Sequence, residues 1–446
     1  MMEKFFYPKS VAVIGASREE RKIGFVLLKN LKEKFKGKVY PVNPNAKEIL
    51  GLKSFPSVLN IDDEIDLAIV AVKASIVPSI LEECGKKGIK NVLIISAGFS
   101  ESGEEGKKLE KELVEIAKEN KIRIVGPNTI GIYNPEVNLD ATFFLDSDVE
   151  KPKEGNVSFF SQSGTIAVLA MENFSKNGIG VSKVVSYGNG CDINECDLIE
   201  YFSKDEKTKV IAGFIEGIKD GKRFLEVIKK CKKPIILLKG GKTESGARAV
   251  ASHTSSMAGD YIVFSNIMKQ FGVIEANTWE ELIDLVKIFS NLEKVSGKNL
   301  AIITNAGGFG VLASDEAEKN GIKLKEPSEK LKEELRKVLP SYASLKNPID
   351  IIADADSERY RNVFKIMEKY KEFDIYLIIV LVQVPSIDES IVEAILSFKK
   401  PKVVVISGKK AKTIYERMIE NKIPVFESPE RAIKAISKFL SVSFSN

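Results

Sequence analysis

The sequence contains a single histidine, His253, and only four cysteines, none of which forms a C-x-x-C pair. Without paired cysteines or a second histidine, a zinc site is not expected, and four scattered thiols do not make a disulfide framework. No metal-binding residues are therefore predicted. Scattered free thiols are typical of the reducing cytoplasm, where we expect the protein to be located.

Long apolar segments are also missing. The most apolar run, 375–382, has the length of a buried strand and falls short of the ~20 residues of a membrane span. The first residues, 1–7, lead directly into a predicted strand, so we expect no secretory signal. Basic residues exceed acidic ones by only 67 to 62, and both kinds are interspersed. Neither nucleic acid nor a membrane is predicted as a partner.

What the chain does contain is a regular alternation of two kinds of segment. Short Val- and Ile-rich runs bounded by Gly, Pro or Asn predict buried parallel strands, and Lys- and Glu-rich segments of helical period lie between them. This pattern predicts the α/β class, and 446 residues suggest about three domains. We expect a Rossmann-like domain over 1–128, followed by two flavodoxin-like parallel α/β domains over 129–292 and 293–446.

The first predicted domain has the small-residue turn of a nucleotide-binding fold. The turn 15–18 follows strand 11–15, but the G-x-G-x-x-G fingerprint is absent, and Asn43 and Asn45 stand where an NAD-binding protein has an acidic residue. Because ligands of such sheets bind at the carboxyl ends of the strands, we predict a nucleotide-like ligand other than NAD. Turns needed only for the fold are the alternative. The candidate contacts are Gly15, Ala16, Ser17, Arg18, Asn43, Pro44, Asn45, Val72, Lys73, Ala74, Ser96, Ala97 and Gly98.

The second predicted domain places hydroxyl groups where a strand meets a helix. The segment Ser161–Thr165 lies between strand 156–160 and a helix that starts near Ile166. Ser163, Gly164 and Thr165 are predicted to bind an anion at the positive end of this helix. A Ser or Thr N-cap with a tight turn is the alternative. A nucleophile elbow does not fit, because it needs glycine on both sides of the serine at a spacing of two.

A glycine-rich segment, 239–246, follows strand 234–238 and leads to His253. We expect a mobile loop here, without full P-loop spacing. Small polar neighbours give His253 no apolar face to pack on, which favours a nucleophile or general base over a structural histidine. Glu216 follows strand 208–214 and could orient an imidazole, with a surface carboxylate at a strand end as the alternative.

Taken in order, these segments resemble the α subunits of ADP-forming acetyl-CoA synthetases, in the succinyl-CoA synthetase superfamily. The resemblance covers essentially the whole chain. It rests on Val13–Ser17, Val39–Pro44, Ile94–Phe99, Gly126–Asn128, Ser161–Thr165, Glu216–Gly217, Ser252–Thr254 and Ala258–Gly259.

The resemblance implies an acid–thiol ligase that interconverts acyl-CoA, phosphate and ADP with the free acid, CoA and ATP. It implies CoA on the first domain, a phosphorylated His253 held by Glu216, and Asn128 and Thr129 at the acyl site. It also implies an ATP-grasp β subunit that binds ADP or ATP with Mg²⁺, in an α2β2 assembly. Since the chain ends at Asn446, we expect that partner to be a separate subunit.

Two departures from the family pattern are visible. Thr129 stands where the succinyl-CoA branch has cysteine, which disfavours succinate, and Ser255 and Met257 alter the segment after His253. Acetate, branched-chain and aryl acids all remain open as substrates. The alternatives to a ligase are a non-catalytic CoA-binding or scaffold subunit, the regulatory half of a protein acyltransferase, and a serine hydrolase that uses Ser163 and His253.

Overall fold

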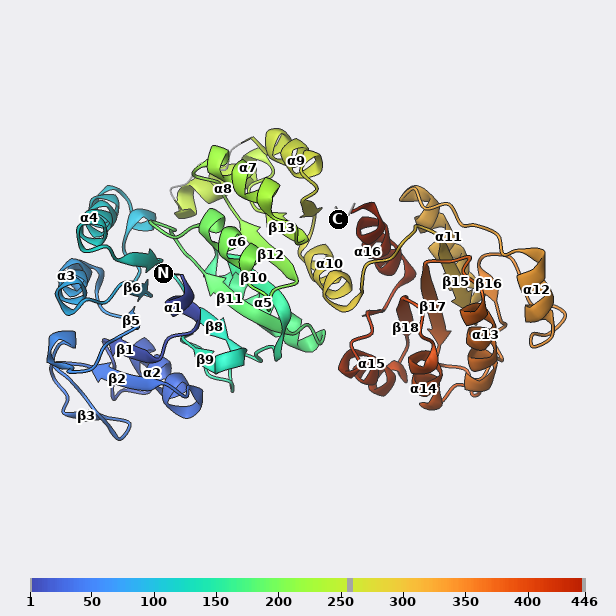
Figure 1. Cartoon of the computed structure of the whole chain (residues 1–446), viewed down its shortest axis with the longest axis horizontal. Coiled ribbons are helices and arrows are strands. Elements are labelled where there is room, and N and C mark those ends of the chain that lie inside the picture. The colour runs from blue at the N-terminus through green and yellow to red at the C-terminus, as the bar shows by residue number, and fades with distance from the viewer. Residues whose placement is uncertain (1, 255–259, 443–446) are drawn as a thin grey trace. The chain divides into compact units, whose positions relative to one another are not determined.

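Three mainly parallel sheets carry the fold of the computed structural model (Figure 1). The structure describes residues 2–254 and 260–442, and the side chains of 252–254 lie outside the described residues. The chain forms two compact units, 1–277 and 278–446. The first unit holds two of the sheets and the second unit holds the third.

The first sheet has five parallel strands in the order β2-β1-β5-β6-β7. Its central strands are buried along their whole length, which explains their unbroken runs of Val and Ile. The strands are β1 (Ser10–Ile14), β2 (Lys38–Val42), β5 (Leu67–Val70), β6 (Asn91–Ile94) and β7 (Arg123–Val125). The helices are α2 (Ile23–Lys34), α3 (Val77–Lys87), α4 (Glu104–Asn120) and the short 3-10 helices η1 (Val58–Asn60), η2 (Ala74–Ile76) and η3 (Ser100–Ser102), beside a small hairpin of β3 (Glu48–Ile49) and β4 (Leu52–Lys53).

The second sheet has the order β14-β13-β12-β10-β11-β8-β9, with its first five strands parallel and the last two antiparallel. Its strands are β8 (Ile132–Asn134), β9 (Leu139–Asp140), β10 (Glu154–Ser161), β11 (Val181–Ser186), β12 (Val210–Ile215), β13 (Ile235–Lys239) and β14 (Ile274–Ala276). A 3-10 helix, η4 (Pro135–Val137), joins β8 to β9. The helices are α5 (Gly164–Lys176), α6 (Glu195–Lys204), α7 (Gly221–Lys230), α8 (Glu244–Thr254) and α9 (Tyr261–Gln270).

The C-terminal unit holds a third parallel sheet, in the order β16-β15-β17-β18-β19. Its strands are β15 (Leu300–Thr304), β16 (Ile349–Asp350), β17 (Ile375–Leu381), β18 (Lys402–Ser407) and β19 (Val425–Phe426). Its helices are α10 (Trp279–Asn291), α11 (Gly307–Lys319), α12 (Glu329–Arg336), α13 (Ser357–Lys369), α14 (Ser390–Ser397), α15 (Ala411–Glu420) and α16 (Pro429–Ser441). Helix α10, expected within 129–292, belongs to this unit and packs on α16. The exact domain boundaries stay a prediction.

The first helix, α1 (Glu3–Phe6), packs against the second sheet. The Phe6 ring stacks on Tyr201 of α6 at 4.8 Å between centroids, and the Phe6 carbonyl accepts a hydrogen bond from the buried amide of Asn134 at 2.9 Å. The buried ammonium of Lys183, on β11, donates to Asp205 at 2.7 Å and to the Tyr7 hydroxyl at 3.1 Å. The start of the chain is thereby fastened to the second domain.

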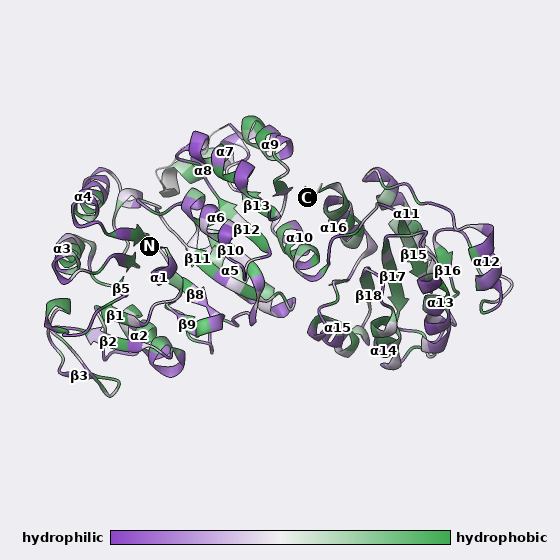
Figure 2. Ribbon diagram, viewed as in Figure 1, coloured by the Kyte–Doolittle hydropathy of each residue, from purple (hydrophilic) through white to green (hydrophobic). Residues whose placement is uncertain are grey.

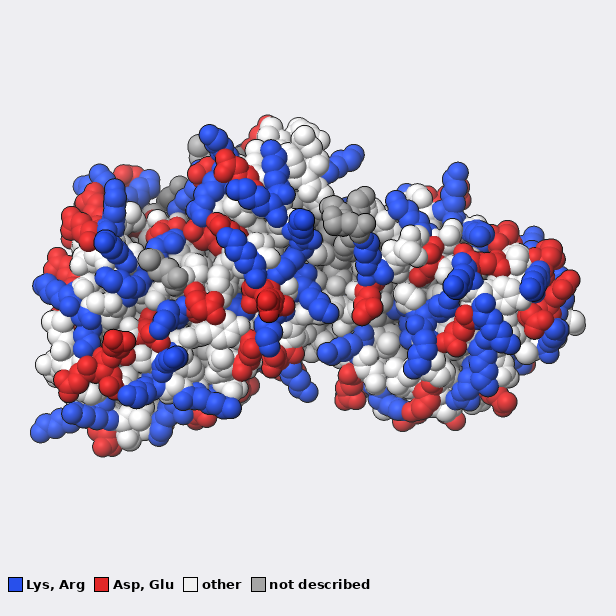
Figure 3. Space-filling model, viewed as in Figure 1, with Lys and Arg blue, Asp and Glu red and all other residues white. Residues whose placement is uncertain are grey.

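The predicted α/β class with three domains is confirmed. Apolar residues gather in the sheets, polar residues on the outer helix faces (Figure 2), and charges of both signs intermingle on the surface (Figure 3). Within the described residues, no helix combines the length and apolar character needed to cross a membrane. One expectation was wrong: 244–254 is the helix α8 rather than a loop. Thr243 accepts from the amides of Gly246 and Ala247, and the alanines that follow favour helix.

Candidate active site

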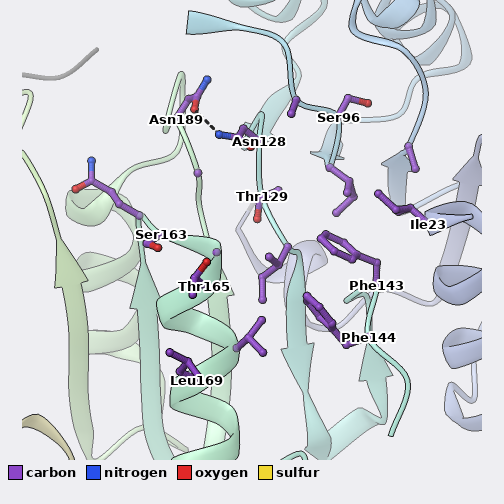
Figure 4. A pocket seen from close by; sticks show the side chains of 18 of the residues that line it. Ile23, Ser96, Asn128, Thr129, Phe143, Phe144, Ser163, Thr165, Leu169 and Asn189 are labelled. Atoms are coloured by element: carbon purple, nitrogen blue, oxygen red, sulfur yellow. Dashed lines mark hydrogen bonds between the residues drawn. The ribbon is translucent and has the colours of Figure 1, made fainter. Parts of the chain in front are cut away.

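A cavity of about 690 Å³ lies in the N-terminal unit, where the carboxyl ends of the first sheet face the start of α5 (Figure 4). It brings together nine of the residues singled out from the sequence, which come from five separate segments of the chain. These are Val72, Ser96, Ala97, Asn128, Thr129, Ser163, Gly164, Thr165 and Glu216. The carboxyl edge of a parallel sheet is where ligands of such folds bind.

On the side of the cavity formed by the first sheet, one serine joins the ends of neighbouring strands. The Ser96 hydroxyl, after β6, donates to the Val72 carbonyl at 2.6 Å and accepts from the Val72 amide at 3.2 Å. The Ser96 carbonyl accepts from the Asn128 amide at 2.9 Å. One residue thus fixes the ends of β5, β6 and β7 relative to each other.

The predicted turn after β1 is tightly packed. A Cβ on Gly24, in the first turn of α2, would lie 1.9 Å from the Gly15 carbonyl oxygen, so only glycine allows α2 to approach the turn. The Asn43 amide donates to the Ala16 carbonyl at 2.7 Å and ties β1 to β2. The described wall of the cavity does not include ten of the predicted CoA contacts: Gly15, Ala16, Ser17, Arg18, Asn43, Pro44, Asn45, Lys73, Ala74 and Gly98. Their contact with CoA stays a prediction.

Asn128 and Thr129 lie where the two domains of the unit meet. Asn128 has a left-handed backbone (φ 60°), which asparagine tolerates better than most residues, and its side-chain amide donates to Asn189 at 3.3 Å. The buried Thr129 hydroxyl donates to the Ser186 carbonyl and accepts from the Gly131 amide at 3.0 Å. Thr129 therefore holds the backbone in place, and Asn128 presents a polar side chain to the cavity.

The start of α5 presents backbone amides to the same cavity. Ser163 is its N-cap, with an extended backbone, and the serine hydroxyl accepts from the Ile166 amide at 3.4 Å. Gly164 is needed because a Cβ there would meet the Ile130 side chain at 2.6 Å. Thr165 is exposed toward the cavity. The unsatisfied amides and positive end of this thirteen-residue helix make a suitable place for phosphate.

Glu216 follows β12 and is buried at the edge of the cavity. Gln162 holds its backbone: the Gln162 side-chain oxygen accepts from the amides of Glu216 and Gly217, the latter at 3.0 Å. The buried ammonium of Lys239 donates to the Glu216 carbonyl at 2.6 Å. Burial lowers the pKa of Lys239 to about 8, although the nearby Glu216 opposes the shift. A carboxylate held in this way can orient a ring N–H and stabilise its positive charge.

The backbone of His253 lies in the last turn of α8, which lies beside η3 of the first domain. Its side chain lies outside the described residues, as do Ser255 and Met257. The contact between the His253 ring and the Glu216 carboxylate therefore stays a prediction.

Three parts of the site were not singled out from the sequence. Gln162 lay inside the Ser161–Thr165 motif and could have been found there. Asn189 belongs to no motif that would have predicted its place in the site; it stands only between two glycines. Phe143 and Phe144 line the cavity from a segment for which the sequence predicted no role.

Comparison with known proteins identifies the class. Three family models match in the expected order: a CoA binding domain over 9–135, a succinyl-CoA ligase like flavodoxin domain over 154–289, and a ligase-CoA domain over 300–425. The order of these domains and the cavity between the first two define a CoA ligase of the succinyl-CoA ligase type.

Relatives define the family more closely. The α subunit of acetate–CoA ligase [ADP-forming] II from Pyrococcus furiosus is 45% identical over 442 residues, which cover 96% of this chain and 95% of the relative. An ADP-forming acetate–CoA ligase from Methanocaldococcus jannaschii is also 45% identical, over 98% of this chain but only 62% of its own length. The dinucleotide-forming acetyl-coenzyme A synthetase 1 of Ca. Korarchaeum cryptofilum, solved with phosphate and ADP, superposes with a TM-score of 0.93 at 36% identity, covering 98% of this chain and 96% of that one.

The chain belongs to the family of ADP-forming acetate–CoA ligase α subunits. This membership supports the ligase interpretation over a non-catalytic CoA-binding subunit.

Proposed function

We propose that this chain is the CoA-binding, phosphohistidine-carrying subunit of an enzyme that interconverts acyl-CoA, phosphate and ADP with acid, CoA and ATP. The observation that carries the proposal is the shared cavity: Asn128, the start of α5 and the Glu216 carboxylate all line it. A thioester carbonyl beside Asn128 would lie next to a phosphate at the start of α5. No larger movement is needed to bring these two reactants together.

In the first step, an oxygen of hydrogen phosphate attacks the thioester carbonyl. A C–O bond forms, the C–S bond breaks, and the phosphate proton leaves with the CoA thiol. The helix amides at Gly164 and Thr165 stabilise the negative charge of the phosphoryl group, which is the main source of catalysis in such transfers. The product is an acyl phosphate in the same cavity.

In the second step, a neutral His253 ring attacks the phosphorus atom. An N–P bond forms, the P–O bond to the acyl group breaks, and the carboxylate leaves. Glu216 accepts the N–H of the other ring nitrogen and stabilises the cationic phosphohistidine. Lys239 and Gln162 support Glu216 by holding the backbone on both sides of it.

The last step transfers the phosphoryl group from His253 to ADP. We propose an ATP-grasp β subunit that binds the nucleotide with Mg²⁺, in an α2β2 assembly located in the cytoplasm. CoA would be held by the first domain, with its pantetheine arm passing Val72, Ser96 and Ala97 into the cavity.

The test is to co-express the chain with the ATP-grasp protein from its source and to supply acetyl-CoA, phosphate and labelled ADP. We expect phosphate-dependent ATP formation, together with an acid-labile, base-stable phosphoryl label on the chain. His253→Ala should remove both, whereas Ser245→Ala, near the start of the same helix, should remove neither. ATP formation by His253→Ala at the wild-type rate would refute the phosphohistidine. Mass determination of the complex tests α2β2.

A further inference from the structure

A second cavity, of about 270 Å³, lies between α7 and α9 in the N-terminal unit (Figure 1). It shares none of its described lining residues with the candidate active site. Apart from Gly221, Lys239 and Asp260, the described residues that line it are apolar. The proposed reaction gives this cavity no role.

The inner wall of the cavity is buried, and its entrance is open. Phe224 from α7, together with Phe264 and Met268 from α9, forms the inner wall, and all three side chains are buried. Aromatic rings beside a methionine sulfur pack well on a flat apolar group. At the entrance, Val263 is 56% exposed, and a Cβ on Gly221 would meet nothing within 4 Å. An apolar cavity that opens in this way is typical of a ligand site.

The Lys239 ammonium brings a positive charge to this apolar wall. Lys239 is 4% exposed, and its Nζ lies 6.0 Å from the centre of the Phe264 ring, so the charged end itself lies beside the cavity. Nζ donates to the carbonyls of Glu216 and Gly240, at 2.6 and 2.5 Å. An ammonium has three N–H groups, and the third has no acceptor among the described residues. A ligand that carries an acceptor would find a donor waiting.

The charges around Lys239 favour a negatively charged acceptor. Burial lowers the pKa of Lys239 to about 8; the nearby Glu216 opposes this shift, and Lys242 adds to it. The other charged residue of the described wall, Asp260, is exposed at the entrance and already accepts from two amides at the start of α9, at 2.7 and 3.3 Å. A ligand carboxylate at Nζ would supply the missing charge through a charge-assisted hydrogen bond.

We propose that the cavity between α7 and α9 is a second small-molecule site, which binds an aromatic monocarboxylate with its carboxylate on Lys239 and its ring against Phe224 and Phe264. Because Lys239 also donates to the Glu216 carbonyl, a bound carboxylate competes with that carbonyl for the ammonium. Occupation of the site therefore loosens the backbone of Glu216 and lowers kcat. The site itself is independent of the proposed function, whereas its effect on kcat rests on it.

The first experiment titrates the full chain with three probes of equal shape and different charge: 2-naphthoate, neutral 2-naphthamide and cationic 2-naphthylmethylammonium. Ligand-observed NMR reports their binding. We expect a Kd of about 1 mM or below for 2-naphthoate, from the affinity per atom that is typical of drug-sized ligands. The amide should bind about tenfold more weakly, and the cation more weakly still. Equal affinities for the three probes, or no binding of 2-naphthoate, would overturn the inference.

Variants locate the bound probe. Val263→Trp, which narrows the entrance, should weaken 2-naphthoate binding about tenfold or more. Ile262→Trp is the matched control, because Ile262 is the preceding residue of α9, is 70% exposed and lies outside the cavity wall. Leu169→Trp narrows the active-site cavity instead and should leave the Kd unchanged. A loss of binding in Leu169→Trp but not in Val263→Trp would put the probe in the active site and refute the second site. Thermal unfolding checks the variants, and the three-probe titration of wild type needs none of them.

The second experiment measures the effect of the site on catalysis, in the ATP-forming assay of the complete complex. Saturating 2-naphthoate should lower kcat about tenfold and leave the KM for acetyl-CoA unchanged, and Val263→Trp should remove this effect. A rise in KM without a fall in kcat, or binding with no change in kcat, would contradict the coupling to Glu216. Absence of ATP formation without any probe would overturn the proposed function, whereas the titrations would still decide whether the second site exists.

Discussion

The side-chain oxygen of Gln162, at the end of β10, accepts hydrogen bonds from the backbone amides of Glu216 and Gly217, at the end of β12. The two strands are neighbours in the sheet, and their ends are joined across the base of the cavity. The position of the Glu216 carboxylate is thus set by a residue that precedes the phosphate-binding helix. The side-chain amide of Gln162 therefore couples the position of Glu216 to the phosphate-binding start of α5.

Gln162→Met keeps the length of this side chain but removes its acceptor oxygen. Two buried amides then lose their partner, and the Glu216 backbone is free to shift. We expect kcat to fall by about 100-fold, as is typical when a catalytic group is displaced by roughly 1 Å. The KM for acyl-CoA should change far less, because the side-chain oxygen of Gln162 is bonded to the end of β12 and not to the predicted CoA contacts of the first domain. Gln270→Met, at the exposed end of α9, serves as the control and should keep wild-type kcat.

Asn189 gives a second prediction, because two carboxylates converge on it. Its side-chain nitrogen donates to Glu101 at 2.6 Å and to Glu110 at 2.8 Å, while its oxygen accepts from Asn128. Asn189→Asp has nearly the same shape but places a third carboxylate against the first two. Like-charge repulsion should displace Asn128 and lower kcat/KM by about 100-fold.

The repulsion itself can be tested by removing one of its sources. In the Asn189→Asp background, Glu110→Gln should recover much of the activity, since it removes a charge and restores a donor. Activity should also recover as the pH is lowered and a carboxyl group becomes protonated. A loss in Asn189→Asp that neither low pH nor Glu110→Gln relieves would contradict this account.

Replacing Lys183 should lower the free energy of unfolding. Its ammonium is fully buried among the rings of Phe6, Tyr7 and Tyr201 and donates to Asp205. Lys183→Met leaves the Asp205 charge without its partner, and breaking a buried ion pair typically costs about 3 kcal/mol or more. Urea unfolding should report this decrease. Lys209→Met, at an exposed position before β12, should lie within about 0.5 kcal/mol of wild type.

Lys287 predicts a pH dependence in the C-terminal unit. It is 2% exposed on α10 and donates to the Val425 carbonyl of β19 at 2.9 Å. Burial lowers its pKa from 10.5 to about 8, with Asp284 opposing the shift. Between these values the unfolded chain binds the proton more tightly than the folded chain, so the free energy of unfolding rises with pH. This contribution is fully present above about 10.5 and is lost as the pH falls to about 8.

This difference between the pKa values of the unfolded and folded chain corresponds to at most about 3.4 kcal/mol. Lys287→Met removes it, so wild type should gain about 2 kcal/mol on this variant between pH 7.5 and 9.5 in urea unfolding. Lys434→Met, at an exposed position on α16, should follow the wild-type slope. Parallel pH profiles for wild type and Lys287→Met would show that Lys287 titrates normally.

Much of the fold could be predicted, because buried parallel strands can be recognised in a sequence as short runs of Val and Ile. Strand 11–15, for example, was predicted within one residue of its observed bounds, Ser10–Ile14, and is buried along its whole length. The segment before His253 was mistaken for a loop, because its glycines and lysines conceal an N-cap at Thr243 followed by helix-forming alanines.

The site was only partly accessible from the sequence. Ser163 and Glu216, which line the cavity, could be singled out because each follows the end of a predicted strand. Asn189 and the Phe143–Phe144 pair could not be found, since their function depends on neighbours more than 30 residues away, such as Asn30 and Glu101. A single sequence does not show which of its many Phe or Asn residues a fold will bring to a cavity.

The fastening of α1 on the second domain has a consequence for biosynthesis. Phe6 and Tyr7 leave the ribosome well before their partners Lys183 and Tyr201, which are translated nearly two hundred codons later. The nascent CoA-binding domain must therefore expose an aromatic end until most of the second domain has emerged. Synthesised alone, that domain would present this end to solvent or to chaperones.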